Sequence, residues 1–135
     1  MSTFMLEIYT PNRQFYNGMV ESVILPILDG SYGVEPGHEP VVTAIQTGEL
    51  RYKVNGEWHV AAVGNGFAEI MPHHTVMLVF SAEHPDEIDL KRAEAAMERA
   101  QERLRQKGSI QEYHHSKAAL ARAMARLKTA HDSHQ

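Results

Sequence analysis

Residues 81–108 read SAEHPDEIDLKRAEAAMERAQERLRQKG, and this stretch divides the chain into two unlike parts. Before it, apolar and polar residues alternate and Gly and Pro recur; within it, alanine and charged residues dominate. Proline disfavours helical backbone in the residue before it, so His84-Pro85 predicts a boundary and a helix from about Asp86, which is expected to cap it. The sequence therefore predicts a β-sandwich domain over residues 1–84 and a two-helix domain over residues 85–135.

The composition narrows the class of protein. The 135 residues include no cysteine, which excludes disulfides, thiol catalysis and cysteine-based zinc sites. No run of about 18 apolar residues is present, and the N-terminus lacks a basic segment followed by an apolar one. We therefore expect no membrane-spanning helix and no secretory signal, which fits a cytoplasmic protein.

The charge is unevenly distributed along the chain. Residues 1–85 carry three Lys or Arg against nine Asp or Glu, whereas residues 86–135 carry ten against eight. An acidic body argues against nucleic acid as a partner. The basic tail would suit an anionic ligand or an acidic protein surface.

The first 80 residues contain the patterns of short strands. Phe4, Leu6 and Ile8 alternate with less apolar residues, and Asn55-Gly56 is a hairpin signal because a type I′ turn needs positive φ at both central residues. The runs with strand character are 4–9, 13–17, 19–27, 41–45, 49–54, 57–63, 67–71 and 75–81. Eight to ten such strands are typical of an antiparallel sandwich or barrel.

The segment 29–40, DGSYGVEPGHEP, is dense in Gly and Pro. It is interpreted either as a rigid irregular connection between sheets or as a surface loop whose shape is preset for a partner. His38 within it is a candidate catalytic or ligand residue, but a lone histidine is more often a packing and hydrogen-bonding residue.

The C-terminal part predicts a helical hairpin. The first helix should end near Gln106 because Gly108 follows, and Ser109 with Glu112 forms a capping box for a second helix over about 110–130. The expected apolar faces comprise Ile88, Ala93, Ala96, Met97, Ala100 and Leu104 on the first helix, and Tyr113, Leu120, Met124 and Leu127 on the second. Alanine buries little area, so we expect a marginally stable pair that can open.

Several arginines share helix faces in this hairpin. Arg92 and Arg99 are seven residues apart and Arg122 and Arg126 are four apart, while Asp89 lies three residues before Arg92. A fold at Gly108 would bring residue 92 level with residue 124. The guanidinium groups could then converge on a multiply charged anion such as a phosphate ester. The alternative is a solvated helix face with intrahelical ion pairs.

The motifs of common enzymes are missing from the sequence. There is no phosphate-binding G-x-x-x-x-G-K-[ST] loop, no G-x-G-x-x-G, no H-E-x-x-H and no nucleophile elbow. The histidine pairs 73–74 and 114–115 are adjacent in sequence, so their side chains would not share a face, and no metal site is predicted. We therefore expect a protein without a catalytic site.

One motif and the domain order resemble a known family. The pattern G-x-x-G-x-x-P-G-H-x-P over residues 30–40 continues into Thr43-Ala44-Ile45 and Gly48. With the β module, the helical hairpin and the total length, the chain resembles epsilon subunits of bacterial F-type ATP synthases from about Phe4 to Ala130. Some members carry an acidic residue where this chain has Ser31, so a rotor-ring contact there would differ in detail.

The resemblance implies a fold and a role. It implies an all-β sandwich of about ten short antiparallel strands followed by a C-terminal α-helical hairpin. The sandwich would bind the gamma subunit of the central stalk and the rotor ring, peripheral to the cytoplasmic face of the cell membrane. The helices would switch between a folded hairpin and an extended form that enters the alpha/beta catalytic head and inhibits ATP hydrolysis.

The resemblance also implies a regulatory ligand. In bacillus-like members the folded hairpin binds ATP with an [IL]-D-x-x-R-A motif, which residues 88–93, IDLKRA, match. The implied ATP contacts are Glu83, Asp89, Arg92, Ala93, Arg99, Arg122 and Arg126. Whether magnesium accompanies the nucleotide is left open, and no catalytic or metal-ligating residue is implied. The competing interpretation is a free-standing binding module whose helices form a dimerisation arm.

Overall fold

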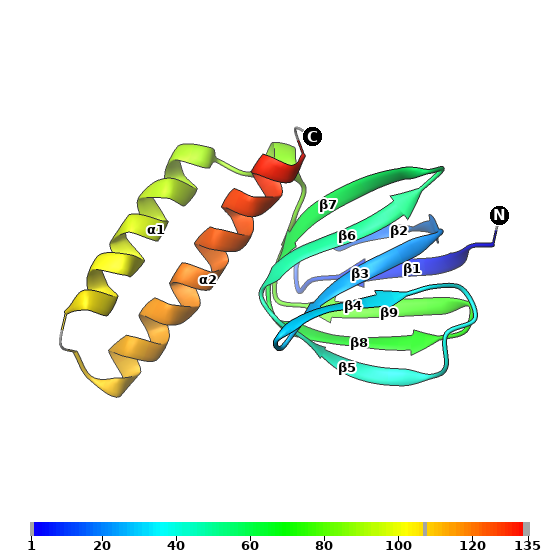
Figure 1. Ribbon diagram of the computed structural model, residues 1–135, viewed down its shortest axis with the longest axis horizontal. Coiled ribbons are helices and arrows are strands. Elements are labelled where there is room, and N and C mark those ends of the chain that lie inside the picture. Colours follow the sequence, from blue (N-terminus) through cyan, green and yellow to red (C-terminus); the bar gives the residue numbers. More distant parts are fainter. Residues whose placement is uncertain (1, 107, 134–135) are drawn as a thin grey trace.

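The computed structural model describes residues 2–106 and 108–133 and has two parts. A β sandwich forms one part and a helical hairpin the other, with helix α2 lying between helix α1 and the sandwich (Figure 1). The strands are β1 Phe4–Tyr9, β2 Gln14–Val20, β3 Ser22–Ile27, β4 Gly30–Val34, β5 Val41–Ile45, β6 Gly48–Val54, β7 Glu57–Val63, β8 Gly66–Met71, β9 His74–Val79 and β10 Ala82–Glu83. The helices are the 3₁₀ turn η1 Pro85–Glu87, α1 Leu90–Arg105 and α2 Ile110–Asp132.

Two five-stranded sheets form the sandwich. One has the order β2-β1-β9-β8-β5 and the other β10-β7-β6-β3-β4. The strand pairs are antiparallel except β1 and β9, which run parallel. Alternate residues point between the sheets, so Phe4, Leu6 and Ile8 of β1 are all buried in the core. The prediction of a sandwich followed by a helical hairpin is therefore confirmed.

The sequence patterns locate most strands, with three differences. Asn55 and Gly56 have φ of 50° and 79°, as the predicted hairpin turn requires. The run 19–27 is divided between β2 and β3 at Glu21, and the Gly-rich segment expected to be irregular contains β4. The two-residue strand β10 pairs with β7 and was not predicted.

Helix α1 begins later than predicted. Asp89 caps it by accepting a hydrogen bond from the Arg92 amide at 3.0 Å, whereas Asp86 lies in the preceding 3₁₀ turn. The prediction that Asp86 caps the helix is therefore wrong. At α2 the predicted cap is confirmed, because the Ser109 hydroxyl accepts from the Glu112 amide at 3.1 Å. The other half of the predicted capping box, a hydrogen bond from the Ser109 amide to the Glu112 side chain, is not formed among the described residues.

Small residues line the contact between the two helices. Ala93 and Ala100 are the buried residues of α1, and they lie seven residues apart on one face. On α2, Ser116 and Ala123 are buried with the same spacing. The predicted stripe on this helix is wrong at two positions, because Tyr113 and Met124 are about half exposed, at 50% and 54%.

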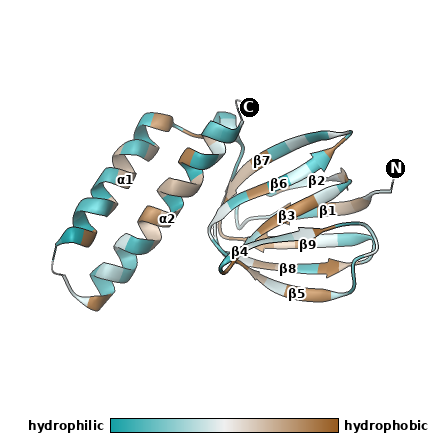
Figure 2. Cartoon of the chain, in the orientation of Figure 1, coloured by the Kyte–Doolittle hydropathy of each residue, from teal (hydrophilic) through white to brown (hydrophobic). Residues whose placement is uncertain are grey.

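The opposite side of α2 covers the sandwich. Ala125 and Thr129 are buried there, one turn apart, and Val60 and Ala62 are buried on the outer face of β7. This explains why β7 ends in four consecutive buried residues, since its inner face meets the core and its outer face meets α2. The outer surface of the hairpin is mainly hydrophilic (Figure 2). Within the described residues, neither helix has the length and apolar character needed to cross a membrane.

Candidate functional site

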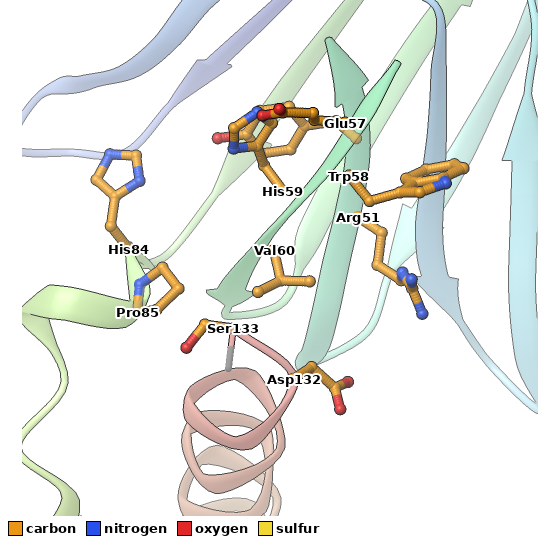
Figure 3. Close-up of a pocket in the computed structure, with 10 residues that line it drawn as sticks. Arg51, Glu57, Trp58, His59, Val60, His84, Pro85, Asp132 and Ser133 are labelled. Atoms are coloured by element: carbon orange, nitrogen blue, oxygen red, sulfur yellow. The ribbon is translucent and has the colours of Figure 1, made fainter. Parts of the chain in front are cut away.

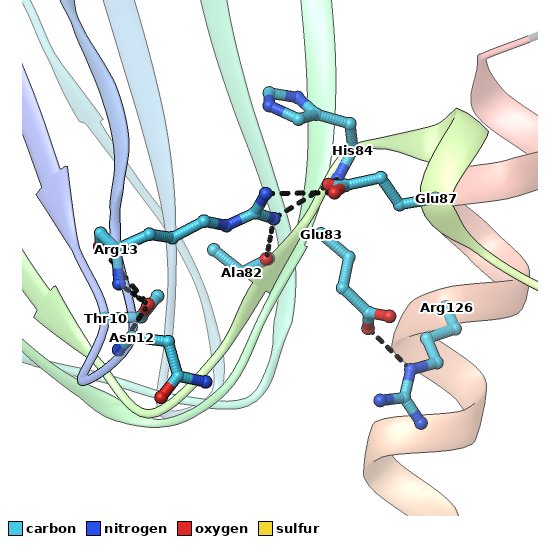
Figure 4. A network of polar contacts seen from close by, with 8 residues as sticks. All are labelled: Thr10, Asn12, Arg13, Ala82, Glu83, His84, Glu87 and Arg126. Atoms are coloured by element: carbon cyan, nitrogen blue, oxygen red, sulfur yellow. Dashed lines mark hydrogen bonds and ion pairs between the residues drawn. The ribbon is translucent and has the colours of Figure 1, made fainter.

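An ion pair joins the sandwich to α2 at the junction of the two parts. The Arg126 Nε donates to Glu83 Oε1 at 2.6 Å, so a residue of β10 is paired with one 43 positions away on the second helix (Figure 4). The two side chains are 36% and 27% exposed, so solvent screens the pair only in part. Both residues were implied as ATP contacts from the sequence, and the structure places them together.

A very small cavity lies beside this ion pair. Glu83, Arg122 and Arg126 line it together with Thr47, Ser81 and the apolar residues Ala62, Val63 and Ala125. Its volume is about 10 Å³, which is room for about one water molecule. Pockets for drug-sized ligands measure roughly 300–1,000 Å³, so a nucleotide does not fit here in this conformation.

The motif residues of α1 occupy different environments. The Asp89 carboxylate is engaged in capping the helix, and Ala93 is buried in the contact with α2. Arg92 and Arg99 are exposed. Within the described residues, no hydrogen bond, ion pair or shared cavity connects either of them to Arg122 or Arg126.

Three of the four candidate arginines therefore keep unused donors. Among residues 2–106 and 108–133, the guanidinium groups of Arg92, Arg99 and Arg122 form no ion pair, and only Arg126 has a carboxylate partner. Guanidinium donors of this kind suit a polyphosphate. The chemistry of the residues fits an anion, but the closed junction offers it no cavity, so the ATP site stays a prediction.

A second polar network anchors the segment between the sandwich and α1. Arg13 of the β1–β2 turn donates to Glu87 at 3.0 and 2.8 Å and to the Ala82 carbonyl at 3.0 Å (Figure 4). Glu87 also accepts from the His84 amide at 2.8 Å. The Arg13 hydrogen bond, followed by the His84 amide, lowers the pKa of Glu87 to about 2. No local sequence signal pairs residues 74 positions apart.

The described residues also form a larger polar cavity of about 670 Å³ near the end of α2. It lies between β6, β7, η1 and that helix end, and its polar lining includes Arg51, His59, His84 and Asp132 (Figure 3). Trp58 contributes its ring, over which the Arg51 guanidinium lies at 5.5 Å from the centroid. No sequence pattern indicates this cavity, because its lining residues come from four separate elements. No cluster of potential metal ligands occurs among the described residues.

The sheet on the far side of the sandwich exposes apolar side chains. Phe67 of β8 and Leu78 of β9 are register partners on its outer face, and each is more than 40% exposed. Phe80, just beyond β9, is 75% exposed. These three residues, with Tyr9 and Pro11, border an open cavity of about 430 Å³. A contiguous exposed apolar surface of this kind is typical of protein contact.

The two residues singled out in the Gly-rich segment have local roles. His38 Nε2 is 2.9 Å from the Tyr32 hydroxyl, and its Nδ1 is 2.7 Å from the Glu39 carbonyl. His38 is therefore a hydrogen-bonding residue that holds the loop against β4. Ser31 lies exposed on β4.

These features define a protein class: a ten-stranded sandwich with a helical hairpin docked on one sheet and an apolar surface on the other. Family models described as "ATP synthase, Delta/Epsilon chain" match almost all of it, the beta-sandwich domain over residues 3–85 and the long alpha-helix domain over residues 86–131. The chain belongs to this family, and it is similar over almost its whole length to proteins named ATP synthase epsilon chain.

Individual relatives agree with this assignment. The ATP synthase epsilon chain of Ruminiclostridium cellulolyticum is 52% identical over 127 residues, covering 94% of this chain and 95% of the relative. That of Caldanaerobacter subterraneus subsp. tengcongensis is 47% identical over 129 residues, covering 95% and 94%. A chain of the Euglena gracilis mitochondrial ATP synthase superposes with a TM-score of 0.83 at 18% identity, over 100% of this chain and 83% of that one. At that identity the likeness supports the fold alone.

Proposed function

We propose that this chain is a non-catalytic subunit of the central stalk of a bacterial F-type ATP synthase. Its sandwich would bind the gamma subunit and the rotor ring, which places it at the cytoplasmic face of the cell membrane without entering the bilayer. Family membership carries this proposal. Structures with the same fold are described as ATP synthase assemblies with a c-ring, and the exposed Phe67, Leu78 and Phe80 supply a surface for such protein contacts.

The hairpin is proposed to act as a conformational switch. Helix α1 packs against α2 through Ala93 and Ala100, and alanine side chains give little buried area for the closed state. Helix α2 in turn contacts the sandwich through the small residues Ala125 and Thr129 and through the ion pairs of Arg126 and Lys128, which water could replace. The helices would therefore extend at a modest free-energy cost, enter the alpha/beta head and inhibit ATP hydrolysis.

ATP is proposed to favour the folded hairpin. The unpaired guanidinium groups of Arg92, Arg99 and Arg122 would take the phosphates, and Arg126 would exchange Glu83 for them. Because the present cavity admits only about one water, binding requires the α1 side of the junction to rearrange. A ligand that binds one state alone stabilises it by about 2.7 kcal/mol at a hundredfold excess over Kd.

Calorimetric titration of the isolated chain with ATP, with and without magnesium, tests this proposal. Arg92→Ala should weaken binding about tenfold to a hundredfold, the value of one charged hydrogen bond. Asp89→Ser keeps a helix cap while removing the carboxylate, so it separates ligand contact from capping. Arg103→Ala, an exposed arginine on the last turn of the same helix, serves as the matched control and should bind normally.

Two results would contradict the ATP proposal. The first is that the wild-type chain shows no heat of binding at millimolar ATP. The second is that Arg92→Ala and Arg103→Ala weaken binding equally. The second outcome would mean that ATP senses only the general charge of the helix. Neither result would affect the assignment to the stalk, which depends on the family and not on the nucleotide.

A further inference from the structure

The C-terminal end of α2 rests on a buried carboxyl group of the sandwich. The Glu49 side chain of β6 is 4% exposed, because α2 covers it. Its Oε1 lies 3.3 Å from the Lys128 ammonium group, which also donates to Asp132 at 2.9 Å. Its other oxygen, Oε2, is buried and receives no hydrogen bond from any described residue. One lysine is thus shared by two carboxyl groups.

The Lys128 ammonium group links the two carboxyl groups, because it contacts both of them. Burial, followed by a hydrogen bond with Asp132, raises the pKa of Glu49 to about 7. The same hydrogen bond lowers the pKa of Asp132. Asp132 is 19% exposed and Glu49 only 4%, so the more buried Glu49 keeps the proton and Asp132 carries the charge. The pair titrates as one unit.

We propose that Glu49, Lys128 and Asp132 form a proton-dependent latch, which holds the end of α2 on the sandwich when Glu49 is protonated and weakens when it ionises. With the proton present, Glu49 donates to Asp132, and Lys128 balances the remaining charge. Without it, two carboxylates face one ammonium group, and Glu49 Oε2 is a buried charge without a donor. The docked end of the helix is then destabilised.

The direction of the pH effect follows from the raised pKa. When the helix end is released, Glu49 faces water and regains its ordinary pKa of 4.5. The latch is therefore fully closed below pH 4.5, weakens as the pH rises from 4.5 to about 7, and is lost above that. The docking constant should fall on the order of a hundredfold between pH 5 and pH 8. Lys128 and Asp132 titrate outside this window, because their pKa values move away from it.

Other charged groups surround the latch and must be separated from it. They are Arg51 of β6, Glu57 and His59 of β7, Glu83 of β10, His84 before η1, and Arg126 and His131 of α2. A pH dependence that arises from any of these groups would persist when residue 49 carries no carboxyl group. Only a substitution at Glu49 distinguishes the latch from them.

The full chain without nucleotide provides the test. The protection factors of amide hydrogens in residues 123–130, corrected for the intrinsic exchange rate, report docking of α2. The fluorescence of Trp58, the single tryptophan of the chain, gives an independent signal. Trp58 and Asp132 line the same cavity, so release of the end of α2 changes the surroundings of the indole ring. The variants are Glu49→Gln, which matches the protonated carboxyl in shape, and Glu57→Gln as the exposed control on the next strand.

The latch predicts that wild type and Glu57→Gln lose protection by about a hundredfold from pH 5 to pH 8, whereas Glu49→Gln stays protected throughout. A pH profile that persists in Glu49→Gln would overturn the latch. If that variant fails to dock at any pH, ¹³C NMR titration of the wild-type Glu49 carboxyl decides. A midpoint near 7 supports the latch, and a midpoint near 4.5 overturns it.

The regulatory meaning of the latch rests on the proposed function, since release of α2 is the first step toward the extended form. The latch and the ATP-dependent switch can be disproved independently of each other. A chain that shows the pH profile but binds no ATP would leave the latch in place and remove the nucleotide switch. A chain that binds ATP but whose α2 docks equally at pH 5 and pH 8 would support the nucleotide switch and overturn the latch.

Discussion

Long-range polar pairs decide how the helical part is attached to the sandwich. Arg13 bonds to both Glu87 and the Ala82 carbonyl, and so holds the connecting segment at the edge of the sheet. Arg126 bonds to Glu83, four residues earlier in the same segment. Each pair joins residues more than 40 positions apart. Such contacts fix the point from which α1 departs, and α2 lies between α1 and the sandwich (Figure 1).

The Arg13 pair can be tested alone. Arg13→Met keeps an unbranched side chain but removes the guanidinium group, which pairs with Glu87 and lies over the Phe15 ring. It should lower the free energy of unfolding at pH 7 by about 0.5–1 kcal/mol, because the pair is partly exposed. Glu87 has a lowered pKa, so its contribution is present above pH 4.5 and is lost as the pH falls through about 2. Urea denaturation at several pH values measures the difference.

The control for this variant is Arg105→Met. It breaks an exposed pair with Glu102 three residues away and should change stability by only a few tenths of a kcal/mol. A difference between wild type and Arg13→Met that is the same at pH 7 and pH 2 would contradict the assignment to Glu87.

At the scale of elements, helix α2 makes two separate contacts, one with α1 and one with the sandwich. Ser116 and Ala123 of α2 face α1, while Ala125 and Thr129 face the sandwich, because residues two apart lie on opposite sides of a helix. The first contact is built from small residues on both helices. It allows close approach of the two backbones but buries little apolar area. We therefore expect the α1–α2 contact to open before the sandwich unfolds.

Overpacking tests the first contact. Ala123→Leu adds volume where Ala123 is only 1% exposed, and such additions cost about 1–3 kcal/mol. Amide exchange in α1 should accelerate on the order of tenfold to a hundredfold, while the buried strands β1 and β9 keep their protection. Ala118→Leu, at an exposed position of the same helix, should leave α1 unchanged. Equal acceleration in helices and strands would show that the molecule opens as one unit.

The sequence predicted these elements where the signals were local. The hairpin at Asn55-Gly56 and the cap at Ser109 each depend on residues within a few positions, and both are confirmed. The late start of α1 was not predicted, because Asp86 and Asp89 are both acceptable capping residues in the sequence. In the structure Asp86 lies within the 3₁₀ turn Pro85–Glu87, so Asp89 is the residue that caps α1. Strand β4 was not predicted because it contains two glycines and is followed by Pro36, whereas its pairing partner lies in β3 and cannot be inferred from the local sequence.

The candidate site was predicted only in part. Spacing along each helix and a fold at Gly108 could place Asp89 and Arg92 near Arg122 and Arg126, and the family resemblance added Glu83 and Ala93. The sequence could not show that Arg126 already has Glu83 as a partner, or that the junction is closed to about one water. It also gave no sign of Glu49, because burial of that carboxyl depends on how α2 lies across β6. Tertiary packing, and not residue type, decides these points.

At the scale of the whole molecule, the two sheets of the sandwich have different tasks. One carries α2 on its outer face, and the other exposes Phe67 and Leu78. A partner on the outer face of the apolar sheet would therefore not cover the face that α2 packs against. The proposed switch follows from this division. In the proposed switch the sandwich would stay bound in the stalk while the helices open, and ATP and the protonation of Glu49 would both favour the closed form.

The distance between α1 and the sandwich measures that switch most directly. The chain contains no cysteine, so Glu98→Cys on α1 and Glu57→Cys on β7 can carry a single pair of spin labels at exposed positions. Pulsed electron paramagnetic resonance should show a mixture of distances without ATP, and one short distance at saturating ATP. The same labels in an Arg92→Ala chain should keep the mixture at that ATP concentration. One narrow distance, unchanged by ATP in either chain, would contradict the account.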